Sequence, residues 1–194
     1  MKKTINSIVN FCRRTLANIL RPISPPEFIF QRLHFRGPFS ISTDGGDKLM
    51  MINYNDHISN RYFWGGLKTP WEYTSREIWR SLAKDASVIL DIGAHNGSYS
   101  LEAKLANPAA RVIAIEPNSN IAERAAANFR LNKFDVELEN VAAGREESVL
   151  AFNGWSFLHQ VGKNEVKTEI RVRRVSDLLA EKNIHHLGLL KIDI

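Results

Sequence analysis

The sequence predicts an α/β fold with a doubly wound, parallel central sheet, and three patterns carry this prediction. The first is Val88–Ile92, a short run of mostly β-branched apolar residues that suits a strand covered on both faces. The second is a glycine-containing turn that leads from this run into a predicted helix from Ser98 to Ala106. The third is another β-branched run, Val112–Glu116, which ends in an acid about twenty residues further on. In open α/β sheets this order places a ligand site at the carboxyl ends of the strands.

The turn after the first strand has the features of a nucleotide site. Gly93 and Gly97 stand where a side chain would block a ligand or a tight turn. The free N–H groups at the start of the following helix face whatever occupies this turn. At the tip of the second strand, the carboxylate of Glu116 can accept hydrogen bonds from both hydroxyls of a ribose. The glycine turn and the distal acid together therefore predict a cofactor that contains a nucleoside.

The spacing of the glycines indicates which cofactor this is. Dinucleotide sites use the pattern G-x-G-x-x-G, whereas Gly93 and Gly97 are spaced G-x-x-x-G and Asp91 stands two residues before the first of them. A carboxylate inside the loop repels a diphosphate but suits a ligand with a cationic amino-acid end. We therefore expect S-adenosylmethionine rather than NAD or ATP, and an NAD-dependent oxidoreductase is kept as an alternative.

Five short motifs occur in order from residue 91 to the end of the chain. They are Asp91–Gly97, Val112–Asn118, Asn128–Asn132, Asn140–Gly144 and Leu190–Asp193. As a set they resemble the FkbM family of S-adenosylmethionine-dependent methyltransferases, over about residues 60–194. Two features depart from the family pattern. His95 and Asn96 stand where the family usually has asparagine and an apolar residue, and the chain ends at Ile194, where the family continues with a Glu-Gly-x-Glu segment.

The resemblance implies a class I methyltransferase fold, which is Rossmann-like, and O-methylation of a hydroxyl on a sugar, a glycan or a natural-product-like small molecule. It also implies positions for the cofactor. The loop after the first strand contacts the methionyl end, the acid and its neighbours hold the ribose, and the end of the third strand meets the adenine. The predicted cofactor residues are Glu72, Asp91, Gly93, Ala94, His95, Gly97, Glu116, Pro117, Asn118, Asn140 and Ala142.

Lys191 and Asp193 end the fourth predicted strand, beside the position where reactants meet in such sheets. Methyl transfer to a hydroxyl needs an in-line approach and removal of a proton. Asp193 is the candidate base or substrate anchor, and Lys191 either orients the substrate or pairs with a carboxylate. His95 is expected to contact the cofactor loop, and no metal site is expected because no second histidine or carboxylate cluster accompanies it.

The length of the core leaves a further alternative open. The chain offers about four core strands, whereas the full class I fold has about seven, so the C-terminal strands are expected to be missing. An inactive, truncated fragment that binds the cofactor weakly or not at all is therefore the alternative function. The fourth strand would then be an exposed edge, which favours self-association into a homo-oligomer.

The amino-acid composition limits the size of the core, the use of cysteine and the kinds of binding partner. A chain of 194 residues with 44% hydrophobic residues can bury one core. The single cysteine, Cys12, excludes an internal disulfide and a cysteine-based zinc cluster, and it favours a reducing, cytoplasmic compartment. Residues 1–36 hold seven basic residues and one acidic residue, so the net charge of +5 belongs to the N-terminus. Because the predicted catalytic part is not basic, nucleic-acid binding is not expected.

Three parts follow one another along the chain. Residues 1–34 combine an amphipathic helix over 2–20 with a proline-rich connector. This helix packs on the domain or on a second copy, or it lies on an anionic membrane surface. Residues 35–84 hold a β-hairpin, an aromatic segment that could cover the cofactor as a lid, and an entry helix with Ile78, Trp79 and Leu82 inward. Residues 85–194 form the incomplete cofactor-binding core.

The remaining elements of the core follow from their patterns. Alanines favour a helix over about 121–131, and residues 135–141 read as the third strand. Residues 142–144 turn out of this strand, and 149–152 and 168–172 form a β pair. A short helix over 175–182 and the fourth strand over 187–194 complete the prediction.

Overall fold

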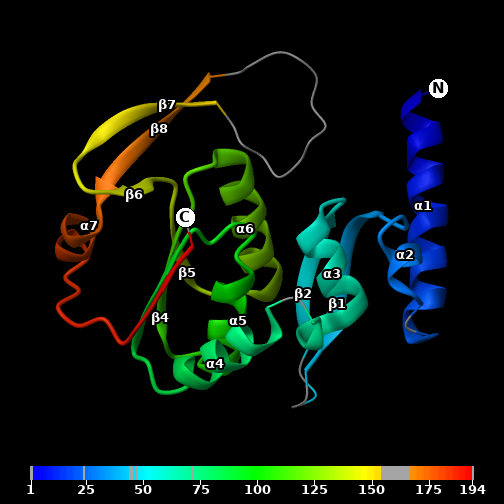
Figure 1. Ribbon diagram of the computed structural model, residues 1–194, viewed down its shortest axis with the longest axis horizontal. Coiled ribbons are helices and arrows are strands. Elements are labelled where there is room, and N and C mark those ends of the chain that lie inside the picture. Colours follow the sequence, from blue (N-terminus) through cyan, green and yellow to red (C-terminus); the bar gives the residue numbers. More distant parts are fainter. Residues whose placement is uncertain are drawn as a thin grey trace. The chain divides into compact units, whose positions relative to one another are not determined.

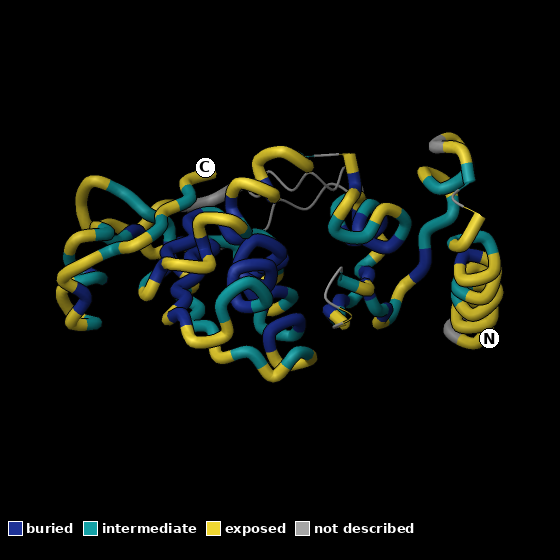
Figure 2. The backbone as a smooth tube through the Cα atoms, turned by 90° about the horizontal axis from the view of Figure 1, so that it is seen from below, coloured by how far each residue is buried: buried dark blue, intermediate teal, exposed yellow. Residues whose placement is uncertain are grey.

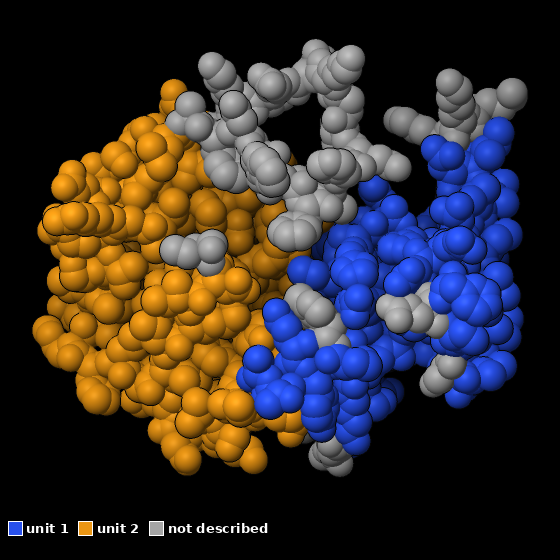
Figure 3. Space-filling model, viewed as in Figure 1, with its two compact units in different colours: residues 1–75 blue, residues 76–194 orange. Residues whose placement is uncertain are grey.

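The computed structural model describes residues 2–23, 25–43, 46, 48–70, 72–153 and 167–193. Figure 1 shows the arrangement of the elements within each part of the chain, and Figure 2 shows burial along it. The chain divides into two compact units, Met1–Ser75 and Arg76–Ile194 (Figure 3). Each unit has its own buried residues, so each can be explained from its own sequence.

The first unit is a helical segment followed by a β-hairpin and two short helices (Figure 1). The hairpin pairs its two strands in antiparallel register, from Arg36 opposite Tyr54 to Ser42 opposite Lys48. This confirms the predicted hairpin, and α1 confirms the predicted helix over 2–20. The elements are α1 (Lys2–Leu20), η1 (Arg21–Ile23), α2 (Glu27–Phe30), β1 (Arg36–Ser42), β2 (Lys48–Tyr54), α3 (His57–Gly65) and η2 (Gly66–Lys68). Among the residues that the structure describes, no helix is long and apolar enough to cross a membrane.

The core of the first unit is aromatic and explains the composition of the segment over 59–72. Phe63 on α3 is fully buried, and its ring lies 4.8 Å from that of Phe35 and 5.5 Å from that of Phe39, measured between centroids. Both pairs have the edge-to-face arrangement that aromatic rings prefer. Asp56 caps α3 by accepting the backbone N–H of Ser59 at 2.8 Å. These aromatic residues therefore have a packing role, while a lid function of this segment stays a prediction.

The second unit is built on a four-stranded parallel sheet with the strand order β5-β4-β3-β9 (Figure 1). This confirms the α/β fold with a parallel central sheet. The unit boundary falls within α4 (Tyr73–Ala83), of which Arg76 onward belongs to this unit. The other elements are β3 (Val88–Ile92), α5 (Ser98–Ala106), β4 (Arg111–Ile115), α6 (Ser119–Asn132), β5 (Val136–Glu139), β6 (Ala142–Gly144), β7 (Ser148–Asn153), β8 (Lys167–Arg174), α7 (Val175–Glu181) and β9 (Leu189–Ile192).

Helices cover both faces of the parallel sheet. Ile89 and Val112 belong to one buried cluster with residues of α4 and α5. Leu90 and Ile113, one position further along their strands, belong to a second cluster with Leu178 of α7. Because successive residues of a strand point to opposite faces, a sheet covered on both sides needs continuous apolar runs. This is why β3 and β4 were recognisable as buried strands.

The second unit also contains a separate three-stranded sheet with the strand order β6-β8-β7, whose strands lie between β5 and β9 along the chain. The predicted β pair is confirmed, because β7 and β8 are antiparallel. The predicted turn over 142–144 is wrong: these residues form β6, which pairs in parallel with β8 from Ala142 opposite Val172. Gly144 permits this close pairing, since a Cβ there would meet the side chain of Val172 at 2.2 Å. Residues 154–166, within the loop that was predicted between these strands, lie outside the described residues.

The inward face of α4 also differs from the prediction. Trp79 is buried as expected, but Ile78 and Leu82 are exposed, and Arg76 is fully buried instead. Arg76 lies within the helix face that covers the sheet because its guanidinium reaches Glu102 of α5, with 2.5 Å between Nη1 and Oε1. An ion pair therefore occupies a core position for which the sequence pattern predicts an apolar residue.

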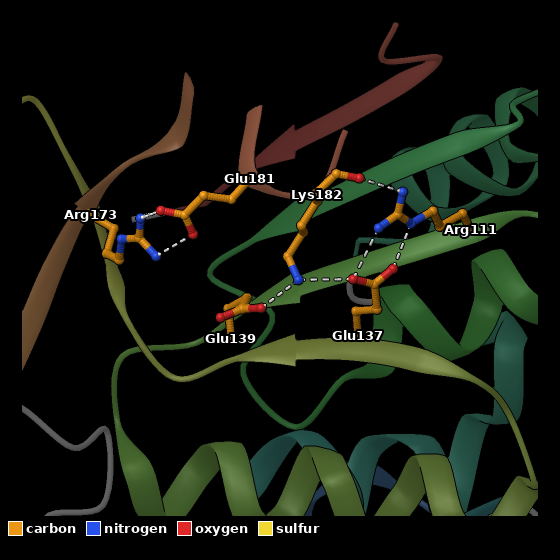
Figure 4. A network of polar contacts seen from close by, with 6 residues as sticks. All are labelled: Arg111, Glu137, Glu139, Arg173, Glu181 and Lys182. Atoms are coloured by element: carbon orange, nitrogen blue, oxygen red, sulfur yellow. Dashed lines mark hydrogen bonds and ion pairs between the residues drawn. The ribbon is translucent and has the colours of Figure 1, made fainter. Parts of the chain in front are cut away.

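The edge strand β5 carries two acids on the same face (Figure 4). Glu137 and Glu139 lie opposite Ile113 and Ile115 of β4, so they occupy the face on which α7 packs. Both contact the Nζ of Lys182, which directly follows α7, at 2.9 Å and 2.6 Å. Arg111 lies 2.6 Å from Glu137 and lowers the pKa of this acid to about 2, with a smaller contribution from Lys182. Ion pairs thus tie the end of α7 to the edge of the sheet.

Candidate functional site

The loops that follow β3 and β4 are joined at the carboxyl end of the sheet. The backbone N–H groups of Gly93 and Ala94 both donate to the carbonyl of Ile115, at 2.9 Å and 3.0 Å. The carboxylate of Glu116 then accepts one N–H from each loop, because Oε2 accepts from His95 and Oε1 from Asn118, each at 2.9 Å. The predicted acid at the tip of the second strand therefore fixes the glycine turn.

Glu116 is suited to bind a polar ligand as well. Its side chain is nearly buried, and this burial raises its pKa, although the two backbone N–H groups offset part of the shift. An ionised carboxylate has about four acceptor positions, of which the two loops occupy two. Each oxygen of Glu116 therefore keeps capacity for a further hydrogen bond, as two ribose hydroxyls would require.

Asp91, at the end of β3, is fully buried. Its Oδ2 accepts a hydrogen bond from the hydroxyl of Ser100 at 2.7 Å, and its Oδ1 lies 3.7 Å from the Nζ of Lys191. Burial raises the pKa of Asp91, and the ammonium of Lys191 and the hydroxyl of Ser100 counteract this shift. Within the described part of the chain, Oδ1 has no hydrogen-bond partner. A donor from a ligand could therefore be accepted here.

Both glycines of the turn adopt left-handed backbone conformations, with φ of 76° at Gly93 and 79° at Gly97. A Cβ at Gly93 would meet the carbonyl oxygen of Asp193 at 1.8 Å. A Cβ at Gly97, the N-cap of α5, would meet the ring of Phe129 on α6 at 2.5 Å. The contacts that require glycine are thus with the protein itself. A role of these glycines in the approach of a cofactor stays a prediction.

Polar side chains inside the protein hold the rest of the turn. The carbonyl of Asn96 accepts a hydrogen bond from Nδ2 of Asn128 on α6 at 2.9 Å, and both asparagines are buried. The Nδ2 of Asn96 has no partner among the described residues. His95 has φ of 51°, and its backbone amide is the group that contacts Glu116. Asn128 was not predicted as a site residue, although an amide on the buried face of α6 is a recognisable signal.

The residues predicted for the ribose and adenine take part in the second loop. Asn118 is the N-cap of α6, since its Oδ1 accepts the N–H groups of Asn120 and Ile121 at 3.1 Å and 3.3 Å. Nδ2 of Asn140 donates to the carbonyls of Glu116 and Pro117, at 2.8 Å and 3.1 Å. Ala142 is half-buried at the start of β6 rather than in a turn. Contacts of these residues with a cofactor stay predictions.

Lys191 and Asp193 lie where β9 ends. Lys191 is the register partner of Asp91 on the neighbouring strand, and its Nζ lies 3.2 Å from Oδ2 of Asp193. The same Nζ lies 4.5 Å from the centre of the Tyr99 ring, within the range of a cation–π interaction. The Asp193 side chain is 68% exposed, so it can meet an acceptor molecule. The structure therefore brings Asp91, Lys191 and Asp193 together.

One known protein family matches this chain. The sequence profile of the family described as "Methyltransferase FkbM domain" matches residues 91–194, which is more than half of the chain. This chain belongs to the FkbM methyltransferase family. The family match confirms the predicted resemblance, and it begins at Asp91, on β3 just before the glycine turn.

The solved structures that match this chain are distantly similar to it. A SAM-dependent methyltransferase from Agrobacterium tumefaciens is 16% identical, with a TM-score of 0.38, and the match covers 53% of this chain and 32% of that one. Methyltransferase FkbM from Methylobacillus flagellatus KT is 15% identical, with a TM-score of 0.41, and the match covers 72% and 38%. The match thus covers about a third of the length of the first structure and about two fifths of the length of the second. No curated protein matches it.

The FkbM match includes every predicted site residue except Glu72. Glu72 belongs to the first unit and has φ of 55°, an unusual conformation for a residue other than glycine. Glu72 lies in the first unit and the glycine turn lies in the second, so a contact between Glu72 and the cofactor stays a prediction. The site in the FkbM domain is built from the ends of β3, β4 and β9.

Proposed function

We propose that this chain binds S-adenosylmethionine and transfers its methyl group to a hydroxyl of a sugar or another small molecule. The observation that carries the proposal is the carboxylate of Glu116, which lies at the end of β4 beside the glycine turn and keeps acceptor capacity on both oxygens. Membership of the FkbM family supports the same reaction class. When bound, the cofactor supplies an electrophilic methyl group on a sulfonium.

The residues present fit this cofactor. Glu116 would accept hydrogen bonds from the two ribose hydroxyls. Asp91 would face the cationic amino-acid end, since its Oδ1 is a buried acceptor without a hydrogen-bond partner in the described part of the chain. The same buried negative charge disfavours the diphosphate of NAD.

Asp193 is the candidate base for the acceptor. Its carboxylate is exposed at the end of β9 and would take the proton that the acceptor hydroxyl loses. Lys191, held by Asp91 and the Tyr99 ring, would keep this carboxylate in place. A proton acceptor at this position would serve a hydroxyl, whose proton must be removed as the new bond forms.

Thermal unfolding in the presence of nucleotides tests the choice of cofactor. We expect S-adenosylmethionine and its product S-adenosylhomocysteine to raise the Tm, since a ligand at a hundred times its Kd stabilises by about 2.7 kcal/mol. NAD at the same concentration should leave the Tm unchanged. A rise with NAD alone, or with none of the three, would contradict the proposal.

Transfer of a labelled methyl group to mixtures of hydroxyl-containing and amine-containing acceptors tests the acceptor class. We expect label on sugars or other alcohols only, and a loss of roughly a hundredfold or more in kcat for Asp193→Asn. Asp177→Asn is the matched control, because Asp177 is a partly exposed acid of α7 outside the site. Label on amines, or equal activity of the two variants, would count against Asp193 and a hydroxyl acceptor.

A further inference from the structure

The first helix is attached to its unit by its polar face. The side chain of Asn10 exchanges two hydrogen bonds with the backbone of Arg36 on β1, at 3.0 Å and 2.6 Å. One turn further along α1, Nη2 of Arg14 donates to the carbonyl of Pro38 at 3.0 Å. Ala17, on the same side of the helix, is fully buried. The side of α1 that lies against β1 is therefore made of amide, guanidinium and alanine groups.

The apolar side of α1 consequently points away from β1. Figure 2 shows most of this helix as exposed. At 100° per residue its large apolar side chains share one face, which is centred near Cys12. Phe11 is 68% exposed and Ile8 is 58% exposed. The exposed apolar residues of α1 are Ile5, Ile8, Val9, Phe11, Leu16 and Ile19. A continuous patch of this kind is typical of a surface that binds something.

The charge of the chain is concentrated in the same unit. Residues 1–75 contain ten Lys and Arg and five Asp and Glu, a balance of +5, whereas residues 76–194 contain sixteen of each. Residues 2–20 include four basic residues and no acidic residue. Arg13, Arg32 and Arg36 are exposed. A partner that covers the apolar face would therefore be attracted most strongly if it carried negative charge.

We propose that α1 docks this protein on the surface of an anionic lipid bilayer. In this arrangement the apolar face enters the boundary between headgroups and acyl chains, and exposed arginines such as Arg13 contact the lipid phosphates. The hydrogen bonds from Asn10 and Arg14 keep the opposite face of the helix on β1. The helix thus lies parallel to the membrane plane and links it to the rest of the first unit.

A second copy of the chain fits this face less well. A coiled-coil seam would contain Ile5, Val9, Cys12, Leu16 and Ile19, which is about two heptads and shorter than stable pairs require. Phe11, the most exposed apolar residue of α1, lies outside that seam. Since α1 contains no acid, Arg13 of one copy would meet only positive charge on the other helix. The apolar face of α1 is broad, and the helix carries basic residues, so a flat anionic surface matches it better.

Co-sedimentation of the full chain with vesicles tests the proposal. We expect binding to phosphatidylcholine vesicles that contain about 30% phosphatidylglycerol, and much weaker binding to pure phosphatidylcholine or at about 1 M NaCl. Ile8→Glu should lower the partition coefficient at least tenfold. Ser7→Glu adds the same charge on the polar side of α1 and should lower it by roughly fivefold or less. Arg13→Gln should also lower it roughly fivefold.

Cys12 provides a direct readout, because it is the only cysteine of the chain, is exposed, and lies in the apolar face. A polarity-sensitive dye on Cys12 should shift its emission to the blue when anionic vesicles are added. The control carries Cys12→Ser and Ser7→Cys, which moves the dye about 140° around the helix and should remove the shift. Equal shifts at both positions, equal binding to neutral vesicles, or a dimer that Ile8→Glu abolishes without any vesicle binding would overturn the proposal.

Discussion

The backbone N–H of His95 donates to Oε2 of Glu116 at 2.9 Å, so a side chain at the end of β4 holds the turn that follows β3. The other oxygen of Glu116 holds the second loop through Asn118. A residue predicted to bind a ribose thus also fixes the protein around it. Experiments on Glu116 must therefore measure folding and ligand binding separately, and glutamine is the substitution that best keeps its shape.

Alanine at the two glycines of the turn should destabilise the second unit. Gly97→Ala would place a Cβ 2.5 Å from the Phe129 ring at a φ of 79°, and overpacking together with backbone strain should cost about 3 kcal/mol. Gly46→Ala is the control, since Gly46 has a φ of 86° and no atom of the described residues lies within 4 Å of the added Cβ, so only about 1 kcal/mol of strain is expected. Urea denaturation measures the free energy of unfolding of Gly97→Ala and of Gly46→Ala, each against the wild type.

The same site allows a rescue experiment. Phe129→Leu removes the ring that the Cβ at residue 97 would meet, so the double variant should recover part of the stability lost in Gly97→Ala. Strictly additive losses in the double variant would show that Phe129 is not the reason for glycine at position 97.

Asp91→Asn should change how stability depends on pH. Burial raises the pKa of Asp91 above its value in the unfolded chain, so the folded state binds more protons and stability falls as pH rises from about 4 through the folded pKa. The asparagine variant lacks this loss, and its stability relative to the wild type should rise over the same range. Asp85→Asn, at an exposed position, should show no such trend. A relative stability that falls with pH would contradict this account.

Glu137 should show the opposite dependence. Its pKa is lowered to about 2, chiefly by the hydrogen bond from Arg111, so its contribution is present above the unfolded pKa of about 4.3 and is lost as pH falls toward 2. Because a third of the side chain is exposed, Glu137→Gln should cost only about 1 kcal/mol at pH 7. Denaturation curves between pH 2 and 7 should show the difference from wild type shrinking with acid. A constant difference would exclude this ion pair as its cause.

Glu102→Gln should be the most damaging change of charge in the second unit. Arg76 and Glu102 are both fully buried, and Arg80 contacts the other oxygen of Glu102, so the variant leaves buried positive charge uncompensated. We expect a loss of about 3–5 kcal/mol in the free energy of unfolding. Glu77→Gln breaks a half-exposed pair with Arg80 and should cost less than about 1 kcal/mol.

A second variant separates charge from packing at this ion pair. Replacement of both residues, as Arg76→Met with Glu102→Leu, should recover much of the loss, because it also removes the buried Arg76 cation that Glu102→Gln leaves unpaired. If the double variant is less stable than Glu102→Gln alone, the contacts of the Arg76 guanidinium, such as the Tyr99 ring at 4.6 Å, matter more than the charge.

The elements of the parallel sheet could be predicted because their signals are local. β3 was predicted with its observed bounds, Val88–Ile92, since a strand covered on both faces reads as a continuous apolar run. α5 was likewise predicted as Ser98–Ala106, between a glycine turn and Asn107-Pro108. The predicted strand over 187–194 is shorter in the structure, as β9 spans Leu189–Ile192. Strand ends depend on pairing with neighbours, which sequence alone does not give.

What could not be predicted depends on contacts between distant parts of the chain. The pairing of Lys191 with Asp91 follows from the register of β9 on β3, across about a hundred residues. Tyr99 was missed because nothing in its sequence neighbourhood indicates that Lys191 and Arg76 lie over its ring. The attachment of α1 by its polar face was missed for the same reason, since helical periodicity identifies an apolar face without showing where it points.

Calorimetric titration with S-adenosylmethionine tests the central claim most directly. The wild type and Glu123→Gln, an exposed acid of α6, should bind with micromolar affinity. Glu116→Gln should bind roughly tenfold more weakly or worse, since the amide offers one acceptor oxygen where the carboxylate offers two. Circular dichroism melts must show that all three proteins are folded. Equal affinity of folded Glu116→Gln and wild type, or no binding to the folded wild type, would contradict the assignment of this turn as the cofactor site.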